Sequence, residues 1–265
     1  MISYSINRED ALLARTFADQ PTGFYIDVGA NRPIDGSVTY HFYERGWRGI
    51  NIEPGAMFAE LAAARPRDIN LPCGVSDSPG KLTFYEFPVM HGYSTCDVAQ
   101  ARTLEARGWE SRRRTIPVRT LADVCAEFVG STTIDFLSVD VEGHERAVLA
   151  GADWSRWRPR VVLVEATRPD STEPTHEAWE SLLLEADYRF ALFDGLNRFY
   201  VRREDEPLIA RLSVPVNVFD AAVPYAHQRR IEELERRVSE LESLIAAGGH
   251  RRGPWRKLRD WLRRK

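Results

Sequence analysis

Residues 24–31 read Phe-Tyr-Ile-Asp-Val-Gly-Ala-Asn, and this stretch indicates the fold most clearly. Its first five residues are mainly apolar and follow the helix breakers Pro21 and Gly23, so they predict a buried β-strand. Gly29 comes directly after that strand, where the main chain has to turn sharply and where a ligand can approach it closely. The stretch therefore predicts a strand that leads into a crossover helix.

The same alternation of strands and helices continues on both sides of this stretch. It is typical of a parallel sheet with crossover helices. In the first part of the chain we expect a helix over 7–19 capped by Asn7, a helix over 37–45 closed by Gly46, a strand over 48–52, a helix over 54–65 and a strand over 69–75.

The second part of the chain begins less regularly and ends in a hairpin, because Asp194-Gly195 separates two apolar runs. The fold class is therefore α/β, a Rossmann-like, mostly parallel seven-stranded sheet with a C-terminal antiparallel hairpin. The elements expected here are a strand over 81–87, a loop over 88–95, helices over 98–107 and 120–128, a strand over 134–139, a helix over 145–150, a strand over 160–165, a helix over 176–186 and strands over 189–193 and 197–201.

Length and charge suggest one core domain with an appendage. The chain has 265 residues, of which 43% are hydrophobic, enough for one core of about 200 residues. We place this domain at residues 1–220. The formal charge of −3 conceals a tail over 250–265 of +7, which leaves −10 for the remainder. A body this acidic argues against nucleic acid as a partner, because phosphate binding requires an extended basic face.

Cys73, Cys96 and Cys125 are odd in number and widely spaced, which fits a reducing compartment better than a disulfide framework or a zinc site. Charges interrupt the N-terminal segment, and no run of about 18 apolar residues occurs. We therefore expect a cytoplasmic protein with neither a signal peptide nor a membrane span.

The first strand and the second end in acidic residues that suit a nucleoside ligand. Asp27 precedes the Gly29 turn, and neither a GxGxxG fingerprint nor a P-loop lysine is present, so a cationic ligand is favoured over a pyrophosphate. Glu53 follows 24 residues after Gly29, a spacing at which a carboxylate reaches ribose hydroxyls. S-adenosylmethionine, which carries an ammonium and a sulfonium, fits this pattern, and a nicotinamide oxidoreductase does not. The candidate ligands of this cofactor are Asp27, Gly29, Asn31, Ser37, Glu53, Ser76, Asp77 and Asp140.

Two of these candidates have an equally good structural explanation. Ser76 and Asp77 follow the third strand, where they can hydrogen-bond an adenine amino group. They are also common turn-forming residues, and Pro79-Gly80 follows them.

A second group of polar residues lies at 140–145, Asp-Val-Glu-Gly-His-Glu, after an apolar strand. His144 titrates near neutral pH and can accept a proton from an attacking hydroxyl. Asp140 should face Glu165, which ends the neighbouring strand, so the pair can orient an acceptor or bind a hard cation such as Mg²⁺. The catalytic candidates are His144, Asp140 and Glu165, and the candidate metal ligands are Asp140 and Glu165. Glu142 and Glu145 can instead simply supply favourable charge to the first helical turn, which is the preferred interpretation for Glu145.

The segments Asp27-Val28-Gly29-Ala30-Asn31, Phe42 to Gly49 with Glu53-Pro54, Arg119 to Asp123, and Asp140 to Glu145 with Val148-Leu149-Gly151 resemble the FkbM family of methyltransferases. The resemblance covers residues 24–166. It implies a Rossmann-like methyltransferase fold, S-adenosylmethionine as donor, and O-methylation of hydroxyls on sugars or polyketides. Asp140 and Glu165 are more distantly similar to the metal-binding acids of catechol and macrolide-sugar O-methyltransferases. Those enzymes have their general base at the position of Gly143, so His144 is a candidate by its chemistry alone.

The loop at residues 90–95 lies between core strands and can close over an acceptor, with Tyr93 stacking on a sugar face. It can equally be a plain connection. The candidate substrate-binding residues are Tyr93, Ser94 and Glu142.

From residue 228 onward the chain carries a heptad pattern, which predicts a coiled-coil helix over 225–247. β-Branched residues at a, leucines at d and complementary charges at e and g favour a parallel homodimer through residues 228–247. The alternative is a single amphipathic helix that packs on its own domain. The assignments are Ile231, Val238 and Ile245 at a, Leu234 and Leu241 at d, Arg230 and Arg237 at g, and Glu235 and Glu242 at e.

The basic tail at 250–265 places Trp255, Leu258, Trp261 and Leu262 near one face of a helix. This pattern suits peripheral contact with an anionic membrane at its inner face, or else a solubilising end. We therefore predict an O-methyltransferase acting on a hydroxyl of a sugar or glycan. The alternative is a catalytically inactive scaffold with the same fold, dimerised by the coil at the membrane.

Overall fold

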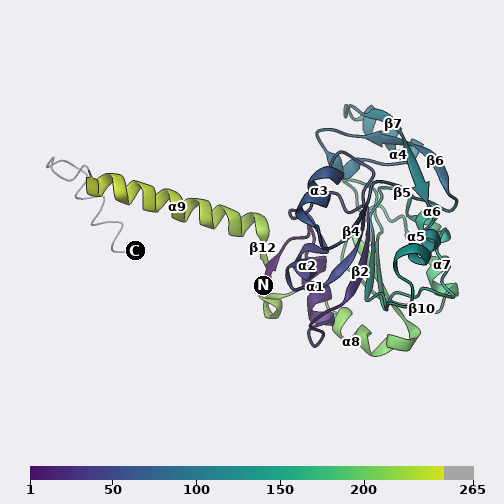
Figure 1. Cartoon of the computed structure of the whole chain (residues 1–265). Coiled ribbons are helices and arrows are strands. Elements are labelled where there is room, and N and C mark those ends of the chain that lie inside the picture. Colours follow the sequence, from purple (N-terminus) through teal and green to yellow (C-terminus); the bar gives the residue numbers. More distant parts are fainter. Residues whose placement is uncertain (248–265) are drawn as a thin grey trace. The chain divides into compact units, whose positions relative to one another are not determined.

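A computed structural model describes residues 1–247 of the chain. It has two units, Met1–Ala222 and Val223–Lys265. Within the described residues, the main sheet of the first unit has seven strands in the order β10-β11-β9-β8-β2-β3-β4 (Figure 1). The strands are β2 (Phe24–Val28), β3 (Arg48–Ile52), β4 (Ile69–Leu71), β8 (Phe136–Val139), β9 (Val161–Glu165), β10 (Tyr188–Phe193) and β11 (Asn197–Arg202).

Five of these strands run parallel, and β10 and β11 are antiparallel to their neighbours. The mainly parallel sheet predicted from the sequence is confirmed. Both faces of the sheet are covered, as the continuous apolar runs require. On one face Ile26 and Val28 pack into a core with residues of α5 (Leu121–Phe128) and α6 (Glu145–Ala150), and on the other Tyr25 packs with Phe42 and Trp47.

Several predicted helices begin later than expected. Helix α1 (Glu9–Thr16) follows Arg8, which has a φ of 66° and makes no side-chain cap, so the prediction that Asn7 caps this helix is wrong. Helix α2 begins at Tyr40 and not at Ser37, and α3 begins at Phe58 and not at Pro54. The first unit also contains α2 (Tyr40–Glu44), α3 (Phe58–Ala64), α7 (Glu180–Glu185) and α8 (Ile209–Leu212). Short 3₁₀ turns lie at His176–Ala178, Arg203–Leu208 and Val218–Asp220.

A second, three-stranded sheet lies beside the main one and has the order β5-β7-β6. The single strand predicted over 69–75 is wrong, because β4 ends at Leu71 and β5 (Gly74–Val75) belongs to this second sheet. Strand β7 was not predicted. It contains four arginines and a proline, and it forms a strand through its pairing with β6. The elements are β6 (Gly80–Glu86), the 3₁₀ turn η1 (His91–Tyr93), α4 (Val98–Ala106) and β7 (Arg112–Arg119).

The second unit contains β12 (Val223–Pro224) and the 23-residue helix α9 (Tyr225–Ala247). Among residues 1–247, no helix combines the length and the apolar composition that a membrane crossing requires. The basic tail with its proposed membrane contact lies outside the described residues, so that contact stays a prediction.

Candidate functional site

The parallel strands β2, β3, β8 and β9 end at one edge of the main sheet, and each is followed or closed there by a residue singled out in the sequence. These residues are Gly29, Glu53, Asp140 and Glu165. Open α/β sheets bind ligands at this edge. The candidate site therefore combines Gly29 and Glu53 from the first part of the sheet with Asp140 and Glu165 from the second.

Three carboxylates meet at the ends of β8 and β9. One oxygen from each of Asp140, Glu142 and Glu165 lies within 4.8 Å of the other two. Asp140 and Glu165 are thus brought together as expected. Glu142 adopts a φ of 54°, and its carbonyl accepts a hydrogen bond from the Thr95 hydroxyl at 2.7 Å. Its Oε2 atom is buried and has no hydrogen-bond partner among the described residues, so it is free to meet a ligand.

Mutual repulsion and crowding by protein atoms favour the protonated forms of these acids. The pKa of Asp140 rises to about 7, because the surrounding protein atoms displace water from its carboxylate and because Glu145 adds negative charge. Burial, followed by the charge of Asp140, also raises the pKa of Glu142 and of Glu165. Each of the three groups therefore releases its proton at a higher pH than an isolated carboxyl group in water.

Glu145 lies in the first turn of α6, as the preferred interpretation from the sequence expected, and its side chain also bonds the main chain of the preceding loop. Its side chain is only 3% exposed. Its Oε1 atom accepts hydrogen bonds from the main-chain nitrogens of Gly143 at 2.9 Å and Val141 at 3.4 Å. Glu145 therefore holds the loop that presents Asp140 and Glu142.

The hydrogen bond that the His144 ring makes is to a residue outside the three carboxylates. The Nε2 atom of the ring hydrogen-bonds the hydroxyl of Ser76 at 3.1 Å. Burial lowers the pKa of His144, against the opposing charges of Asp97 and Asp77, so the ring is neutral near pH 7. The structure therefore joins His144 to Ser76 and Asp77, the residues expected at the adenine, and its role as general base stays a prediction.

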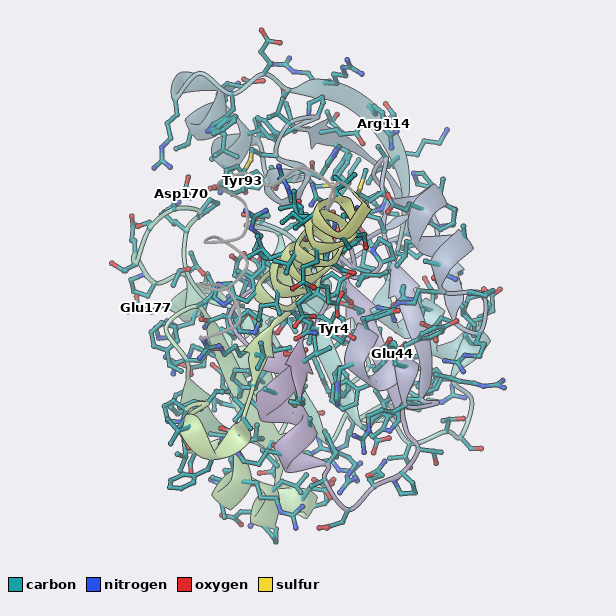
Figure 2. The ribbon with its side chains drawn as sticks, turned by 90° about the vertical axis from the view of Figure 1, so that its left-hand side faces the viewer. Tyr4, Glu44, Tyr93, Arg114, Asp170 and Glu177 are labelled. Atoms are coloured by element: carbon teal, nitrogen blue, oxygen red, sulfur yellow. The ribbon has the colours of Figure 1, made fainter. Side chains whose placement is uncertain are left out.

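The loop at 90–95 is fixed on the protein by hydrogen bonds. The Tyr93 hydroxyl donates to the Asp170 carboxylate at 2.5 Å, a contact whose two residues are labelled in Figure 2. This bond is the main reason that the pKa of Tyr93 rises to about 12. Ser94 accepts a hydrogen bond from the main-chain nitrogen of Phe87. Ser94 therefore shapes the loop, and Tyr93 is held by a partner that the sequence did not suggest.

On the donor side, the turn after β2 is held against β3 and β8. Gly29 has a φ of +87°, and a Cβ at this position would lie 1.7 Å from the carbonyl oxygen of Asp140. The main-chain nitrogens of Gly29 and Ala30 donate to the carbonyl of Ile52 at 3.0 and 3.1 Å. The glycine is thus required by the close approach of two chain segments, whereas the sequence suggested the approach of a ligand.

Glu53 lies beside this turn and accepts two main-chain hydrogen bonds. Its Oε2 bonds the nitrogen of Asn31 at 2.9 Å, and its Oε1 bonds that of Gly55 at 2.5 Å. Burial raises the pKa of Glu53. Asn31, at a φ of 48°, has a buried Oδ1 without a hydrogen-bond partner among the described residues. Each carboxylate oxygen of Glu53 keeps a further lone pair for a ribose hydroxyl.

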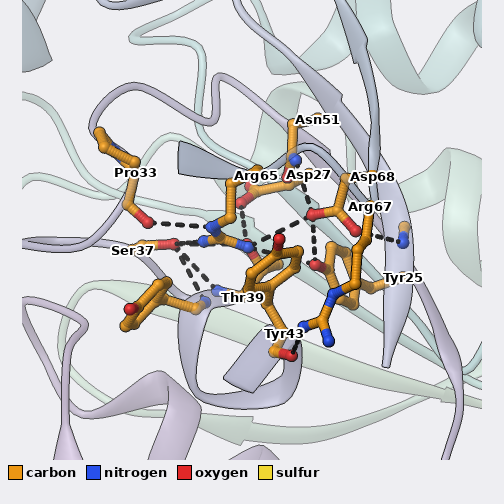
Figure 3. A network of polar contacts seen from close by, with 12 residues as sticks. Tyr25, Asp27, Pro33, Ser37, Thr39, Tyr43, Asn51, Arg65, Arg67 and Asp68 are labelled. Carbon is orange, nitrogen blue, oxygen red and sulfur yellow. Dashed lines mark hydrogen bonds and ion pairs between the residues drawn. The ribbon is translucent and has the colours of Figure 1, made fainter. Parts of the chain in front are cut away.

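Asp27 does not project freely toward a ligand as the sequence suggested. It is 5% exposed, and its Oδ2 accepts a hydrogen bond from the Thr39 hydroxyl at 2.9 Å (Figure 3). Burial raises its pKa to about 6, and the nearby charge of Arg65 opposes the shift. Asp27 is therefore bonded to the segment that leads into α2, and its role toward a ligand stays a prediction.

Arg65, at the end of α3, is the centre of the network around Asp27 (Figure 3). Its guanidinium is fully buried and donates to the hydroxyls of Ser37 at 2.8 Å and Tyr25 at 3.2 Å. It also bonds the carbonyl of Pro33 at 3.0 Å and forms an ion pair with Asp68 at 3.4 Å. Ser37 is therefore a structural residue of this network.

The family model described as "Methyltransferase FkbM domain" matches residues 27–190, which include all four strand ends of the site. The chain belongs to the FkbM methyltransferase family. It is also similar to "Methyltransferase sdnD" of Sordaria araneosa, with 33% identity over 129 residues that make up 41% of this chain and 50% of that protein. The chain thus spans half the length of this relative.

Two solved methyltransferase structures resemble the FkbM-type chain at low sequence identity. The first is a TehB-like SAM-dependent methyltransferase from Corynebacterium glutamicum, with a TM-score of 0.40, 8% identity, and coverage of 73% of this chain and 88% of that one. The second is magnesium protoporphyrin IX methyltransferase from Synechocystis, with a TM-score of 0.39, 12% identity, and coverage of 73% and 77%.

Proposed function

We propose that this FkbM-family chain transfers a methyl group from S-adenosylmethionine to a hydroxyl of a sugar or glycan. One observation carries the proposal: the Gly29 turn lies directly against the main chain of Asp140. A donor held at the turn would therefore have its methyl group next to the group of carboxylates.

For the donor, the structure offers complementary groups at both ends of the nucleoside. Glu53 accepts the ribose hydroxyls with the lone pairs left over from its main-chain contacts. Ser76 and His144, which are hydrogen-bonded to each other, face the adenine. The carboxylates of Asp27 and Asp140 provide the negative field that the ammonium and the sulfonium require.

For the acceptor, the proposal assigns the proton to Asp140. The methyl group is already activated on the sulfonium, so the protein has to align a hydroxyl with it and remove one proton. Asp140 directly follows β8 at the edge of the sheet and has a pKa of about 7, close to the value at which a general base works best near neutral pH. Glu142 and Glu165 accept hydrogen bonds from the same or a neighbouring hydroxyl.

A divalent cation such as Mg²⁺ is the finer part of the proposal. Three carboxylate oxygens within 4.8 Å of one another match the hard oxygen ligands that Mg²⁺ prefers, and Glu142 also has a buried Oε2 atom without a hydrogen-bond partner among the described residues. Acceptor hydroxyls or water would supply the other ligands. Titration of Mg²⁺ into the protein followed by calorimetry tests this part, with Glu142→Gln and Glu165→Gln as the variants that should lose binding.

Transfer of a labelled methyl group to extracted cell-surface glycans tests the proposed activity. The wild-type protein should label a glycan, and mass spectrometry should find the methyl group on oxygen. Asp140→Asn should reduce the rate by at least about 100-fold, the usual contribution of a general base, whereas His144→Ala should keep most of it. The reverse result would return the role of base to His144, and label on nitrogen would contradict the hydroxyl acceptor.

The competing hypothesis is a scaffold that keeps the fold without catalysis. It requires that the protein labels no glycan and that S-adenosylmethionine does not bind. The arrangement of Glu53 and Asp140 at one edge favours the enzyme, because a scaffold has no use for a raised pKa and an unpartnered buried carboxylate beside the donor turn.

A further inference from the structure

Helix α9 exposes a continuous apolar stripe along one side. Its residues are Ile231, Leu234, Val238 and Leu241, which are 47%, 45%, 49% and 55% exposed. Ile231, Leu234 and Val238 line a shallow groove along the helix together with Glu235, Ser239 and Glu242. Most of the stability of a protein helix comes from packing of its apolar face, so a helix of 23 residues such as α9 gains stability from a partner that covers this stripe.

We propose that a second copy of this chain covers the stripe and that the two α9 helices form a parallel two-stranded coiled coil. The proposal concerns assembly and is independent of the methyl-transfer proposal. Its first support is the spacing of the stripe, which repeats every 3.5 residues on average, as a two-stranded coil requires. β-Branched residues occupy the a positions (Ile231, Val238 and Ile245), and leucines occupy the d positions (Leu234 and Leu241).

The second support is the arrangement of charges beside the stripe. Arg230 and Arg237 are at g, and Glu235 and Glu242 are at e. In a parallel pair each g residue faces the e residue five positions later on the other helix, so every contact joins an arginine to a glutamate. In an antiparallel pair, g would face g and e would face e, which brings like charges together. The charges therefore select a parallel coil.

The third support is that most of these flanking charges are not used within α9. Among the described residues, Glu235, Arg237 and Glu242 form no ion pair, whereas Arg230, the fourth flanking charge, pairs within the helix. Arg236 pairs with Glu240 at 2.6 Å, and Arg230 pairs with Glu233 at 2.8 Å. Glu235 and Glu242 line the groove, and Arg237 lies at g on the other side of the a/d stripe, where a partner helix would meet them.

Sedimentation of the full-length protein over a range of concentrations up to about 100 μM tests the proposal, because two heptads give a weak coil. We expect the wild-type protein to be a dimer at the upper end of this range. The double variant Glu235→Arg/Glu242→Arg should be monomeric, as should Arg230→Glu/Arg237→Glu, and an equimolar mixture of the two should form a heterodimer. A monomeric wild-type protein, or a charge-reversed variant that dimerises as well as the wild type, would overturn the proposal.

A matched control separates the interface from general effects of charge. Glu232→Arg/Glu240→Arg changes the net charge by the same amount at positions b and c, away from the groove, and should leave the dimer intact. Leu234→Asp/Leu241→Asp should give monomers whose first unit melts at the wild-type temperature. If that variant still dimerises, the interface lies elsewhere and the proposed coil is excluded.

Discussion

Gly29 lies so close to the main-chain oxygen of Asp140 that a Cβ at position 29 would be 1.7 Å from it. Gly29, in the turn after β2, and Asp140, directly after β8, are thus in main-chain contact. Neither can move without the other. This contact joins the two halves of the proposed site.

Gly29→Ala should therefore destabilise the protein and abolish donor binding. The alanine would need both a φ of +87° and a shift of the Asp140 main chain. Strain of this kind and overpacking each cost about 1–3 kcal/mol, so we expect a loss of about 3 kcal/mol or more in the free energy of unfolding. Urea denaturation measures it.

The matched control is Gly195→Ala, in the turn between β10 and β11. Gly195 has a φ of +102°, and a Cβ added there would meet nothing within 4 Å. Gly195→Ala should therefore lower the free energy of unfolding only by the cost of the backbone conformation, about 1–2 kcal/mol. This variant should keep donor binding. Equal losses for the two variants would show that the contact with Asp140 has no effect on stability.

Arg65→Met should be strongly destabilising, because it leaves Asp68 buried without its cation and removes donors from Ser37 and Tyr25. Removing one partner of a buried pair costs about 3–5 kcal/mol. Arg67→Met, at an exposed site two residues along the chain, should cost about 1 kcal/mol or less. Equilibrium unfolding of both variants by urea compares the two. A loss below about 1 kcal/mol for Arg65→Met would contradict the central role given to this network.

Arg65 also shows where prediction from the sequence stops. The segment Ala64-Arg65-Pro66-Arg67 reads as the charged end of a helix, and nothing in it indicates full burial. The strand ends with Glu53, Asp140 and Glu165 could be predicted, because apolar runs locate strands and a parallel sheet brings their carboxyl ends together. The partners of Arg65 come from β2, from the loop before α2 and from the turn after α3, so most of these contacts exist only in the folded chain.

The same distinction holds for the carboxylate group. That Asp140 and Glu165 meet follows from the order of the strands. The φ of 54° that turns Glu142 toward them, and the main-chain contacts that bury Glu145, depend on the loop geometry. Strand β7 was missed for a related reason, because its pairing with β6 overrides a composition that argues against a strand.

Glu9 should make the protein less stable as the pH rises. It is buried, and burial raises its pKa to about 7, above its value in the unfolded chain. The folded state therefore binds the proton more tightly, and the stability it provides is full below about pH 4 and is lost as the pH rises through about 7. The free energy of unfolding should fall by up to about 1.4 kcal/mol per pH unit from this group.

Glu9→Gln should flatten this pH dependence. It removes the titration while preserving the bond that Asn197 donates to Oε1 at 2.8 Å. The exposed Glu60→Gln serves as the control and should leave the dependence unchanged. Urea denaturation at several pH values gives both slopes. A slope in Glu9→Gln identical to that of the wild type would show that Glu9 does not titrate in this range.

The rate of methyl transfer should rise with pH and level off above about 7, because Asp140 has to lose its proton before it can accept another. The positive charge of the bound donor should lower the pKa of Asp140. The rise should therefore occur at lower pH in the pH profile of kcat than in that of kcat/KM for the donor. Asp140→Asn should abolish the rise together with most of the activity. If the rate of that variant still rose over the same pH range, the titration would belong to another group.

Calorimetry with S-adenosylmethionine tests the central claim most directly, since it needs no knowledge of the acceptor. We expect one donor bound per chain, a loss of about 10-fold or more in affinity for Glu53→Gln, because a hydrogen bond to a charged group contributes about 1.5–3 kcal/mol, and retained binding for His91→Ala in the neighbouring loop. No binding by the wild-type protein, or equal affinity for the wild type and Glu53→Gln, would contradict the claim.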